Sequence, residues 1–182
     1  MYGFIDLIKS DLYRYRGESS LKAFLKTYIG YRLYRLMFWN RFASLLKRKR
    51  IFVFAYITKK IYQNICRRSG VELPLTVKIG YGCKINHGFG LVVNSQTVIG
   101  NNVTLIHNLT FSKEKGKAPV IGDKVRFSPG AIIVGGVIIG NNSVIGANCV
   151  VTKDVPENDI AVGIPNRCLG RKYVDHDERY YC

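Results

Sequence analysis

Apolar residues recur at every sixth position over the C-terminal two thirds of the chain. The series is unbroken from Ile121 onward, and the same spacing occurs upstream, with a two-residue slip after Leu91 and about four extra residues within 112–117. This period fits neither an α-helix, which repeats every 3.6 residues, nor a strand that alternates every two. It is typical of a parallel β-helix whose coils have three short sides. The residues in this phase are Leu73, Ile79, Ile85, Leu91, Ile99, Leu105, Phe111, Ile121, Phe127, Ile133, Ile139, Ile145 and Val151.

Small residues and asparagines mark the expected corners of these coils. A glycine or serine follows several of the repeating apolar positions, as Gly80, Gly122 and Ser128 do. Asn-Asn pairs at 101–102 and 141–142 fall where the chain must turn, and asparagine tolerates left-handed backbone angles better than most residues. The sequence therefore predicts that each apolar position points into the coil and that the residues after it form a corner.

The first 70 residues have a helical pattern instead. Apolar residues are spaced by three and four from Ile5 to Tyr15, along a long segment from Leu21 to Leu46, and again from Phe54 to Ile65. Ser20 can cap the long segment, and Gly70 can end the last helix. We therefore expect a helical region at 1–70, a β-helix domain at 71–170 and a C-terminal tail at 171–182.

The charge of the chain is concentrated in that helical region. Of the formal net charge of +16, residues 1–70 carry +13, from 16 basic and three acidic residues, together with 15 of the 22 aromatic residues. Three explanations remain open. The helices pack on the rest of the protein and expose a solvated basic face, or they bind an anionic membrane surface with Trp39 and other aromatic residues at the interface, or they bind nucleic acid. No nucleic-acid-binding motif supports the third, so nucleic acid is not an expected partner.

The lengths of the apolar runs and the cysteine content argue against a membrane-spanning, a disulfide-rich or a zinc-binding protein. The longest wholly apolar run, Ile51 to Ile57, is far shorter than the roughly 20 residues of a membrane-spanning helix. Five cysteines form no CxxC pair, which indicates reduced thiols rather than a disulfide framework or a zinc cluster. We expect a cytoplasmic protein, with peripheral contact at the inner face of the cytoplasmic membrane as an option.

Two of the three histidines share one position of the repeat. His87 is the third residue of the hexad that begins at Ile85, and His107 is the third of the hexad that begins at Leu105. If both hexads form the third side of successive coils, the imidazoles stack about 4.8 Å apart, the strand spacing of a sheet. A neutral imidazole is a suitable general base. His176 lies in an acidic tail and is expected to be solvated.

The repeat region resembles the hexapeptide-repeat acyltransferases with a left-handed β-helix. The resembling segments are 78–82, 85–93, the hexads 121–150, 151–156 and the terminator Ala161-Val162-Gly163-Ile164-Pro165, within roughly 100 residues of the chain. Within this family the sequence is similar to the serine acetyltransferase-like branch, which includes capsule, colanic-acid and O-antigen O-acetyltransferases. The left-handed winding is taken from the resemblance.

The resemblance implies a set of roles for residues of this chain. His87, in the motif Asn86-His87-Gly88, is the base that activates an acceptor hydroxyl for direct attack on acetyl-CoA, and no metal is expected. Asn86 and His107 are further candidate catalytic residues. The family also implies a homotrimer with active sites between subunits, and the bulge at 112–117 is a candidate cover for the site. The residues expected to bind acetyl-CoA are Ser128, Gly130, Gly146, Ala147, Lys153, Gly163 and Arg167.

Two departures from the serine acetyltransferase pattern guide the choice of acceptor. Asn86 stands where those enzymes usually have Asp, and Ala118-Pro119 stands where they have a His-Pro pair. Together with the short basic N-terminal region, these differences favour O-acetylation of a bacterial surface-polysaccharide sugar or its lipid-linked precursor. The alternative is a serine O-acetyltransferase that acts on free L-serine. A β-helix carbonic anhydrase would need three clustered histidines, and a non-enzymatic scaffold is a further remote alternative.

Overall fold

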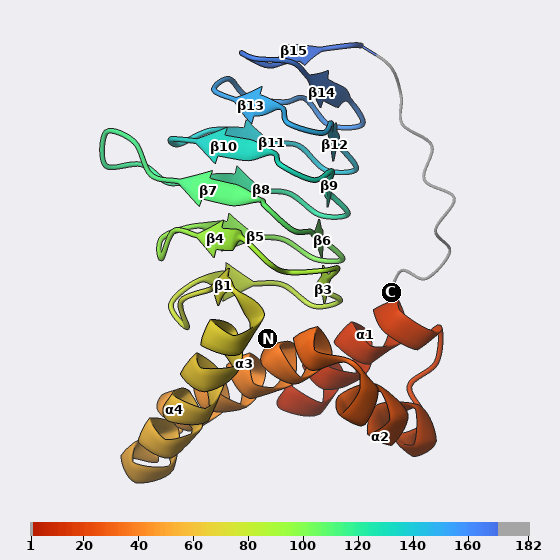
Figure 1. Cartoon of the computed structure of the whole chain (residues 1–182), viewed down its shortest axis with the longest axis vertical. Coiled ribbons are helices and arrows are strands. Elements are labelled where there is room, and N and C mark those ends of the chain that lie inside the picture. Colours follow the sequence, from red (N-terminus) through yellow and green to blue (C-terminus); the bar gives the residue numbers. More distant parts are fainter. Residues whose placement is uncertain (1, 171–182) are drawn as a thin grey trace.

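The computed structural model describes residues 2–170, which form a base of four helices and a column of parallel coils that stands on it (Figure 1). The predicted tail at 171–182, with His176, lies outside the described residues. The helices are α1 (Phe4–Arg16), α2 (Leu21–Gly30), α3 (Arg32–Arg48) and α4 (Phe52–Ser69).

The long helical segment expected at 21–46 is two helices. It breaks at Gly30 and Tyr31, where α2 ends and α3 begins. The side chain of Ser20 accepts a hydrogen bond from the backbone N–H of Ala23, as expected for a cap. α4 ends at Gly70, whose φ of 62° is the left-handed conformation in which glycine is favoured.

The coils form three parallel sheets, one for each side. Sheet A contains β1 (Val71–Glu72), β4 (Leu91–Val93), β7 (Thr110–Ser112), β10 (Ile132–Val134) and β13 (Val150–Val151). Sheet B contains β2 (Lys78–Ile79), β5 (Val98–Ile99), β8 (Val120–Ile121) and β11 (Ile138–Ile139). Sheet C contains β3 (Lys84–Ile85), β6 (Thr104–Leu105), β9 (Arg126–Phe127), β12 (Val144–Ile145), β14 (Ile160–Val162) and the antiparallel β15 (Arg167–Cys168).

The six-residue period is confirmed by what faces inward. Ile85, Leu105, Ile133, Ile145 and the other repeating positions are almost all buried in one continuous core that fills the coils. Apolar burial is the main favourable contribution of such a stack, and each coil covers the next. The asparagine corners are also confirmed, since Asn102 and Asn142 have φ values of 55° and 58°.

The two-residue slip lies earlier than the sequence suggested. Ile85 pairs with Leu105 and Val93 pairs with Phe111, so the corner between these strands is two residues longer in the first coil than in the second. The extra residues therefore lie before β4, in the corner that contains His87, and not after Leu91. The four extra residues near 112–117 are where they were expected, at the corner between β7 and β8.

Helix α1 closes the lower edge of the first coil with its side chains. Ser10 accepts a hydrogen bond from the N–H of Gly82, and Asp11 accepts one from the N–H of Cys83. The Tyr15 hydroxyl donates to the carbonyl of Ile85 and accepts from its N–H, at 3.0 and 3.1 Å. Backbone groups that would otherwise lack a neighbouring strand are satisfied in this way.

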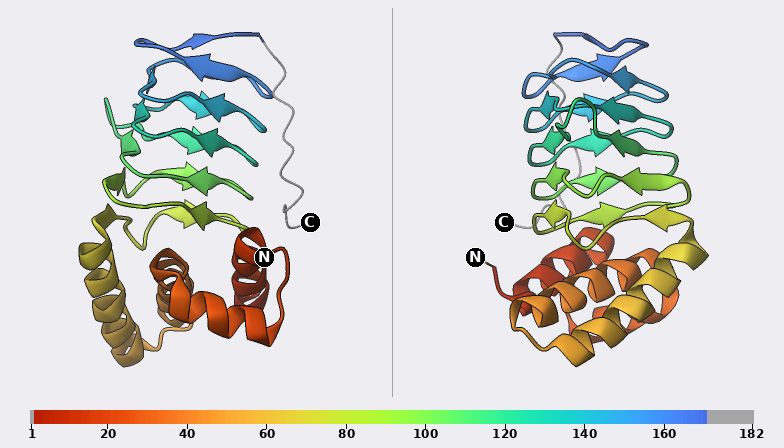
Figure 2. Two further views of the ribbon diagram at one scale, coloured as in Figure 1. Left: turned by 45° about the vertical axis from the view of Figure 1, so that its right-hand side comes forward. Right: turned by 90° about the vertical axis from the view of Figure 1, so that its left-hand side faces the viewer.

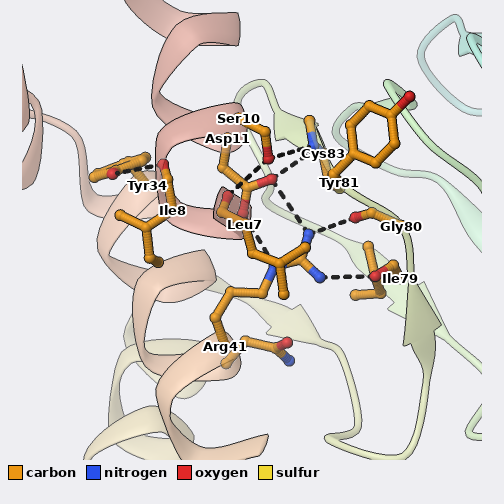
Figure 3. Close-up of polar contacts among 12 residues, drawn as sticks. Leu7, Ile8, Ser10, Asp11, Tyr34, Arg41, Ile79, Gly80, Tyr81 and Cys83 are labelled. Atoms are coloured by element: carbon orange, nitrogen blue, oxygen red, sulfur yellow. Dashed lines mark hydrogen bonds and ion pairs between the residues drawn. The ribbon is translucent and has the colours of Figure 1, made fainter. Parts of the chain in front are cut away.

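A buried ion pair lies at the same contact (Figure 3). Arg41 of α3 donates to both carboxylate oxygens of Asp11, at 3.1 and 3.2 Å, and to the carbonyls of Ile79 and Gly80. Burial raises the pKa of the Asp11 carboxyl, and the ion pair with Arg41 opposes that rise. Two helices and the first coil are thus fastened by one polar cluster.

Many aromatic residues of the helical region pack inside it. Tyr34 is fully buried. Trp39, which one of the three explanations places at a membrane interface, is only partly exposed and donates to the Tyr28 hydroxyl. Part of α4 remains exposed, including Phe52 and Phe54. Within residues 2–170, no helix is both long enough and apolar enough to cross a membrane.

Candidate active site

The two histidines lie side by side at one corner of the β-helix. His87 follows β3 and His107 follows β6, two strands that pair in parallel with Ile85 opposite Leu105. Both therefore occupy the corner between sheets C and A, in successive coils. Their ring centroids are 5.8 Å apart and the rings meet edge to face, at 86°. The predicted column of imidazoles is present, although the rings do not stack face to face.

The extended corner of the first coil shapes the backbone around His87. His87 itself is exposed and adopts a φ of 58°, and Gly88 and Gly90 also have positive φ values. A Cβ on Gly88 would come within 2.7 Å of the Leu33 side chain of α3, which would have to move, so a glycine eases this close approach. The N–H of Asn86 donates to the carbonyl of Leu105, which fixes the residue before the histidine against the next coil.

His107 is more enclosed than His87. Its ring is partly buried, and its Nδ1 atom is buried with no hydrogen-bond partner among the described residues. A buried polar atom without a partner costs about 1–3 kcal/mol, so such atoms in proteins are usually satisfied by a ligand, water or a neighbouring subunit. This imidazole therefore has hydrogen-bonding capacity to offer at the site.

Most of the residues expected to bind acetyl-CoA line the same corner in the coils above. Phe127 pairs with Ile145, and Ile145 with Ala161, which aligns the residues after β9, β12 and β14. The N–H groups of Ser128 and Gly146 donate within the sheet, so these residues offer a ligand mainly close approach and the Ser128 hydroxyl. The residues in this column are Ser128, Gly130, Gly146, Ala147 and Gly163.

Arg167, Lys153 and the loop at 113–117 lie outside this corner column. Arg167 is exposed on β15 opposite Val162, close to the upper end of the corner column. Lys153 follows β13 at the other edge of sheet A, and Asn166 accepts hydrogen bonds from its N–H and that of Thr152. The loop at 113–117 also leaves that other edge, so within one chain it does not cover the histidines. No group of three or more His, Cys, Asp or Glu residues that could hold a metal ion occurs within 2–170.

Comparisons with known proteins decide the family. Residues 118–153 match the model described as bacterial transferase hexapeptide (six repeats). Over 172 aligned residues the chain is 35% identical to the serine acetyltransferase of Bacillus licheniformis, with 91% of this chain and 78% of that protein covered. The chain belongs to the serine acetyltransferase family. It is an O-acetyltransferase of the hexapeptide-repeat, left-handed β-helix type.

Other members of this family support the assignment. The serine acetyltransferase of Bacillus subtilis is 30% identical over 171 residues, with 91% of this chain and 77% of that protein covered. Among solved structures, the Neisseria gonorrhoeae enzyme superposes with a TM-score of 0.78 at 25% identity, over 94% of this chain and 67% of that one. A soybean serine acetyltransferase complexed with serine superposes with a TM-score of 0.76 at 30% identity, over 90% of this chain and 68% of that one.

The prediction of a surface-polysaccharide O-acetyltransferase is therefore wrong. Its main argument was that Asn86, Ala118 and a basic helical region depart from the serine acetyltransferase pattern. An alignment that covers 91% of this chain includes most of residues 1–70, so the helical region has a counterpart in those enzymes. Two substituted side chains and a basic helical region are weaker evidence about the acceptor than 35% identity over 172 residues.

Sequence reasoning missed the residues that support the site from below. Three side chains of the helices bond to the backbone of the first coil, at positions two to eight residues before His87. They are those of Tyr15, Asp11 and Arg41. In the sequence they are a tyrosine, an aspartate and an arginine within helical patterns, and nothing in the spacing links them to residues about 40–70 positions away. The isolated acidic Asp11, in a region with three carboxylates, was the one available signal.

Proposed function

We propose that this chain transfers the acetyl group of acetyl-CoA to the hydroxyl of L-serine, with His87 as general base. The proposal is supported by the contact between His87 and His107 at one corner of a serine acetyltransferase-like fold. Imidazole is the side chain most often used to accept a hydroxyl proton near neutral pH. The exposed position of His87 lets an acceptor approach it.

The reaction needs no acetyl-enzyme. His87 takes the proton of the serine hydroxyl as its oxygen attacks the carbonyl carbon of the thioester, and a new C–O bond forms. The tetrahedral oxyanion then collapses, the C–S bond breaks, and the leaving thiolate of CoA takes the proton from the imidazolium. The products are O-acetylserine and CoA, and the imidazole is neutral again.

His107 and Asn86 are proposed to hold the acceptor. The ring of His107 meets that of His87, and the amide of Asn86 can form a hydrogen bond with a small polar molecule beside them. An amide at position 86 carries no charge, so its contribution is orientation rather than stabilisation of an imidazolium. Ala118 cannot form a hydrogen bond through its side chain, so it contributes none to the acceptor.

Acetyl-CoA is proposed to lie along the corner column above the histidines. Ser128, Gly146 and Ala147 present little bulk, so an extended pantetheine arm can approach the backbone there. Arg167, which pairs with Val162 near the top of the column, is proposed to bind phosphate groups. Lys153 can contribute to phosphate binding only from the other edge of sheet A.

We further propose a homotrimer. Outward-facing apolar residues lie on two sides of the coils, with Val120 and Ile138 in register on sheet B and Ile132 on sheet A, all exposed. Contiguous exposed apolar positions on a rigid scaffold are typical of subunit contacts. In such an assembly the loop at 113–117 could cover a neighbour's site instead of its own.

The decisive experiment measures CoA release by the purified chain. Release of the free thiol from acetyl-CoA should require L-serine and yield O-acetylserine by mass spectrometry. A parallel set of acceptors comprises D-serine, L-threonine and free sugars, which test whether the hydroxyl is chosen within an amino acid. Absence of serine-dependent release by a folded trimer would contradict the proposal.

A further inference from the structure

The connection between α3 and α4 forms an apolar and basic projection at the base of the molecule. We call residues 47–57 the hairpin tip: the last residues of α3, the turn and the first turn and a half of α4. Figure 2 shows that this end of α4 points away from the coils. The tip takes no part in the site at the histidine corner.

The apolar side chains of the hairpin tip face solvent. Phe52 is 70% exposed, Val53 72%, Phe54 63% and Tyr56 61%, whereas α4 buries its other face through Thr58 and residues farther along. Soluble proteins rarely leave so many large apolar residues together on the surface unless that surface binds something. A groove of about 910 Å³ continues from Phe52 and Tyr56 along α4 toward the first coil.

The charge at the tip is of one sign. Lys47, Arg48, Lys49 and Arg50 precede the apolar residues and are exposed, and Lys59 and Lys60 follow them. The chain contains no aspartate or glutamate between Glu18 and Glu72. The tip therefore combines an apolar surface with basic residues on helices that contain no carboxylate after Glu18, and Glu72 of β1 borders only the groove that leads toward the first coil.

This combination selects among possible occupants. A second copy of this chain, bound through the same surface about a two-fold axis, would bring two clusters of like-charged residues together, Lys49 and Arg50 among them, which is unfavourable. A nucleic acid would satisfy the basic residues but would leave the exposed aliphatic Val53 and Ile57 without a partner. An anionic bilayer satisfies both, because headgroups attract Lys and Arg while Phe and Tyr enter the interface.

We propose that the hairpin tip binds the surface of anionic phospholipid membranes. The apolar residues of α4 enter the boundary between headgroups and acyl chains, and the basic residues of the turn contact the headgroups. In the trimer proposed above, a three-fold axis along the coils would place three tips on one face, so weak individual contacts would add through avidity.

The test is binding of the full-length chain to vesicles. We expect it to float with phosphatidylcholine vesicles that contain about one-third phosphatidylserine, to bind pure phosphatidylcholine poorly, and to be released as salt rises from about 0.1 M to about 0.5 M. The variants Phe52→Ser/Phe54→Ser and Lys49→Glu/Arg50→Glu should each need at least about tenfold more anionic lipid for half-binding. Their serine-dependent activity without vesicles should match that of the unmodified chain.

Matched controls separate the tip from general charge and hydrophobicity. Ile5→Ser/Ile29→Ser removes two equally exposed apolar side chains from α1 and α2, and Lys113→Glu/Lys115→Glu makes the same charge change on the coils; both should bind vesicles normally. The proposal is overturned if the unmodified chain ignores anionic vesicles or if the tip variants bind as well as it does. It is also overturned if tip variants form smaller assemblies in sedimentation velocity, or if the chain binds a mixed-sequence oligonucleotide more tightly than lipid.

Discussion

His87 and His107 touch each other but have different surroundings. His87 is exposed on an extended corner with a left-handed backbone, whereas His107 is partly buried and has an unpartnered nitrogen. Because His87 is exposed, the acceptor and acetyl-CoA can both reach it, which suits a residue that transfers a proton. The more enclosed His107 is better suited to orient the substrate or the ring of His87.

Substitution of the two histidines should separate these roles. His87→Asn, which retains a residue that tolerates the left-handed conformation, is expected to lower kcat by about 10²–10⁴. His107→Asn is expected mainly to raise the KM for L-serine. Steady-state kinetics with both substrates measure this split, and unchanged thermal unfolding serves as the control. A His87→Asn enzyme with nearly normal kcat would remove the proposed base.

The buried pair of Asp11 and Arg41 makes a second prediction at this scale. Asp11→Asn leaves the Arg41 guanidinium buried without its counter-charge, so unfolding should become easier by about 3–5 kcal/mol. The double variant Asp11→Asn/Arg41→Gln removes both charges while keeping polar groups for the backbone of the first coil, and it should lose less stability than the single variant. Urea unfolding followed by circular dichroism compares them. A single variant as stable as the parent would contradict the role given to the pair.

The sequence predicted the positions of only some of the side chains at the site. The shared hexad position brought His87 and His107 together correctly, because the repeat fixes which side of a coil a residue joins. Lys153 is expected to bind acetyl-CoA by resemblance alone, and its place at the other edge of sheet A was not given by the repeat. The choice of acceptor depended on two substituted side chains, and single positions are poor evidence when a ligand contacts several.

At the scale of single elements, helix α1 supports the free edge of strand β3. The first strand of sheet C has no coil below it, and Tyr15 supplies both of the hydrogen bonds that Ile85 would otherwise lack. His87 follows two residues later. Helix α1 therefore holds the strand from which the proposed base projects.

Removal of that one hydroxyl tests the connection. Tyr15→Phe leaves a buried N–H and a buried carbonyl without partners, at a cost of about 1–3 kcal/mol each. We expect a lower unfolding midpoint and a lower kcat. Tyr34→Phe is the matched control, because its hydroxyl bonds only to Ile8 within the helices. Equal loss of activity in both variants would show a general effect of stability instead of support for β3.

The boundaries of elements were harder to predict than their existence. Leu91 and Val93 are both buried in β4, so the apolar pattern allowed either to be the repeating position, and the slip was placed on the wrong side of the strand. Corner residues face outward and leave no trace in such a pattern. The break at Gly30 was missed for a related reason: apolar spacing continues across it, although glycine is a weak helix former.

The whole molecule has an outer surface that one chain does not use. Val120 and Ile138 lie beside each other on sheet B and face solvent. Packing of these positions against a neighbour would remove apolar area from water and complete a site between subunits.

A charge placed there should disrupt the assembly. Val120→Lys/Ile138→Lys is expected to convert a trimer of 20.6 kDa chains into monomers in light scattering and to lower activity in parallel. The variant Ile5→Lys, at an even more exposed apolar position of α1, should leave the assembly unchanged. Full activity of the parent chain as a monomer would argue against a shared site.

The two ends of the stack are closed in different ways. Side chains of α1 and α3 occupy the lower rim, and at the top β15 runs antiparallel to β14 as the last strand of sheet C. A parallel solenoid with bare rims could accept further copies end to end and grow into fibres. Because each end of the stack has its own closing element, whole coils can be inserted or deleted between the ends. Neither change would expose a strand edge that could pair with another molecule.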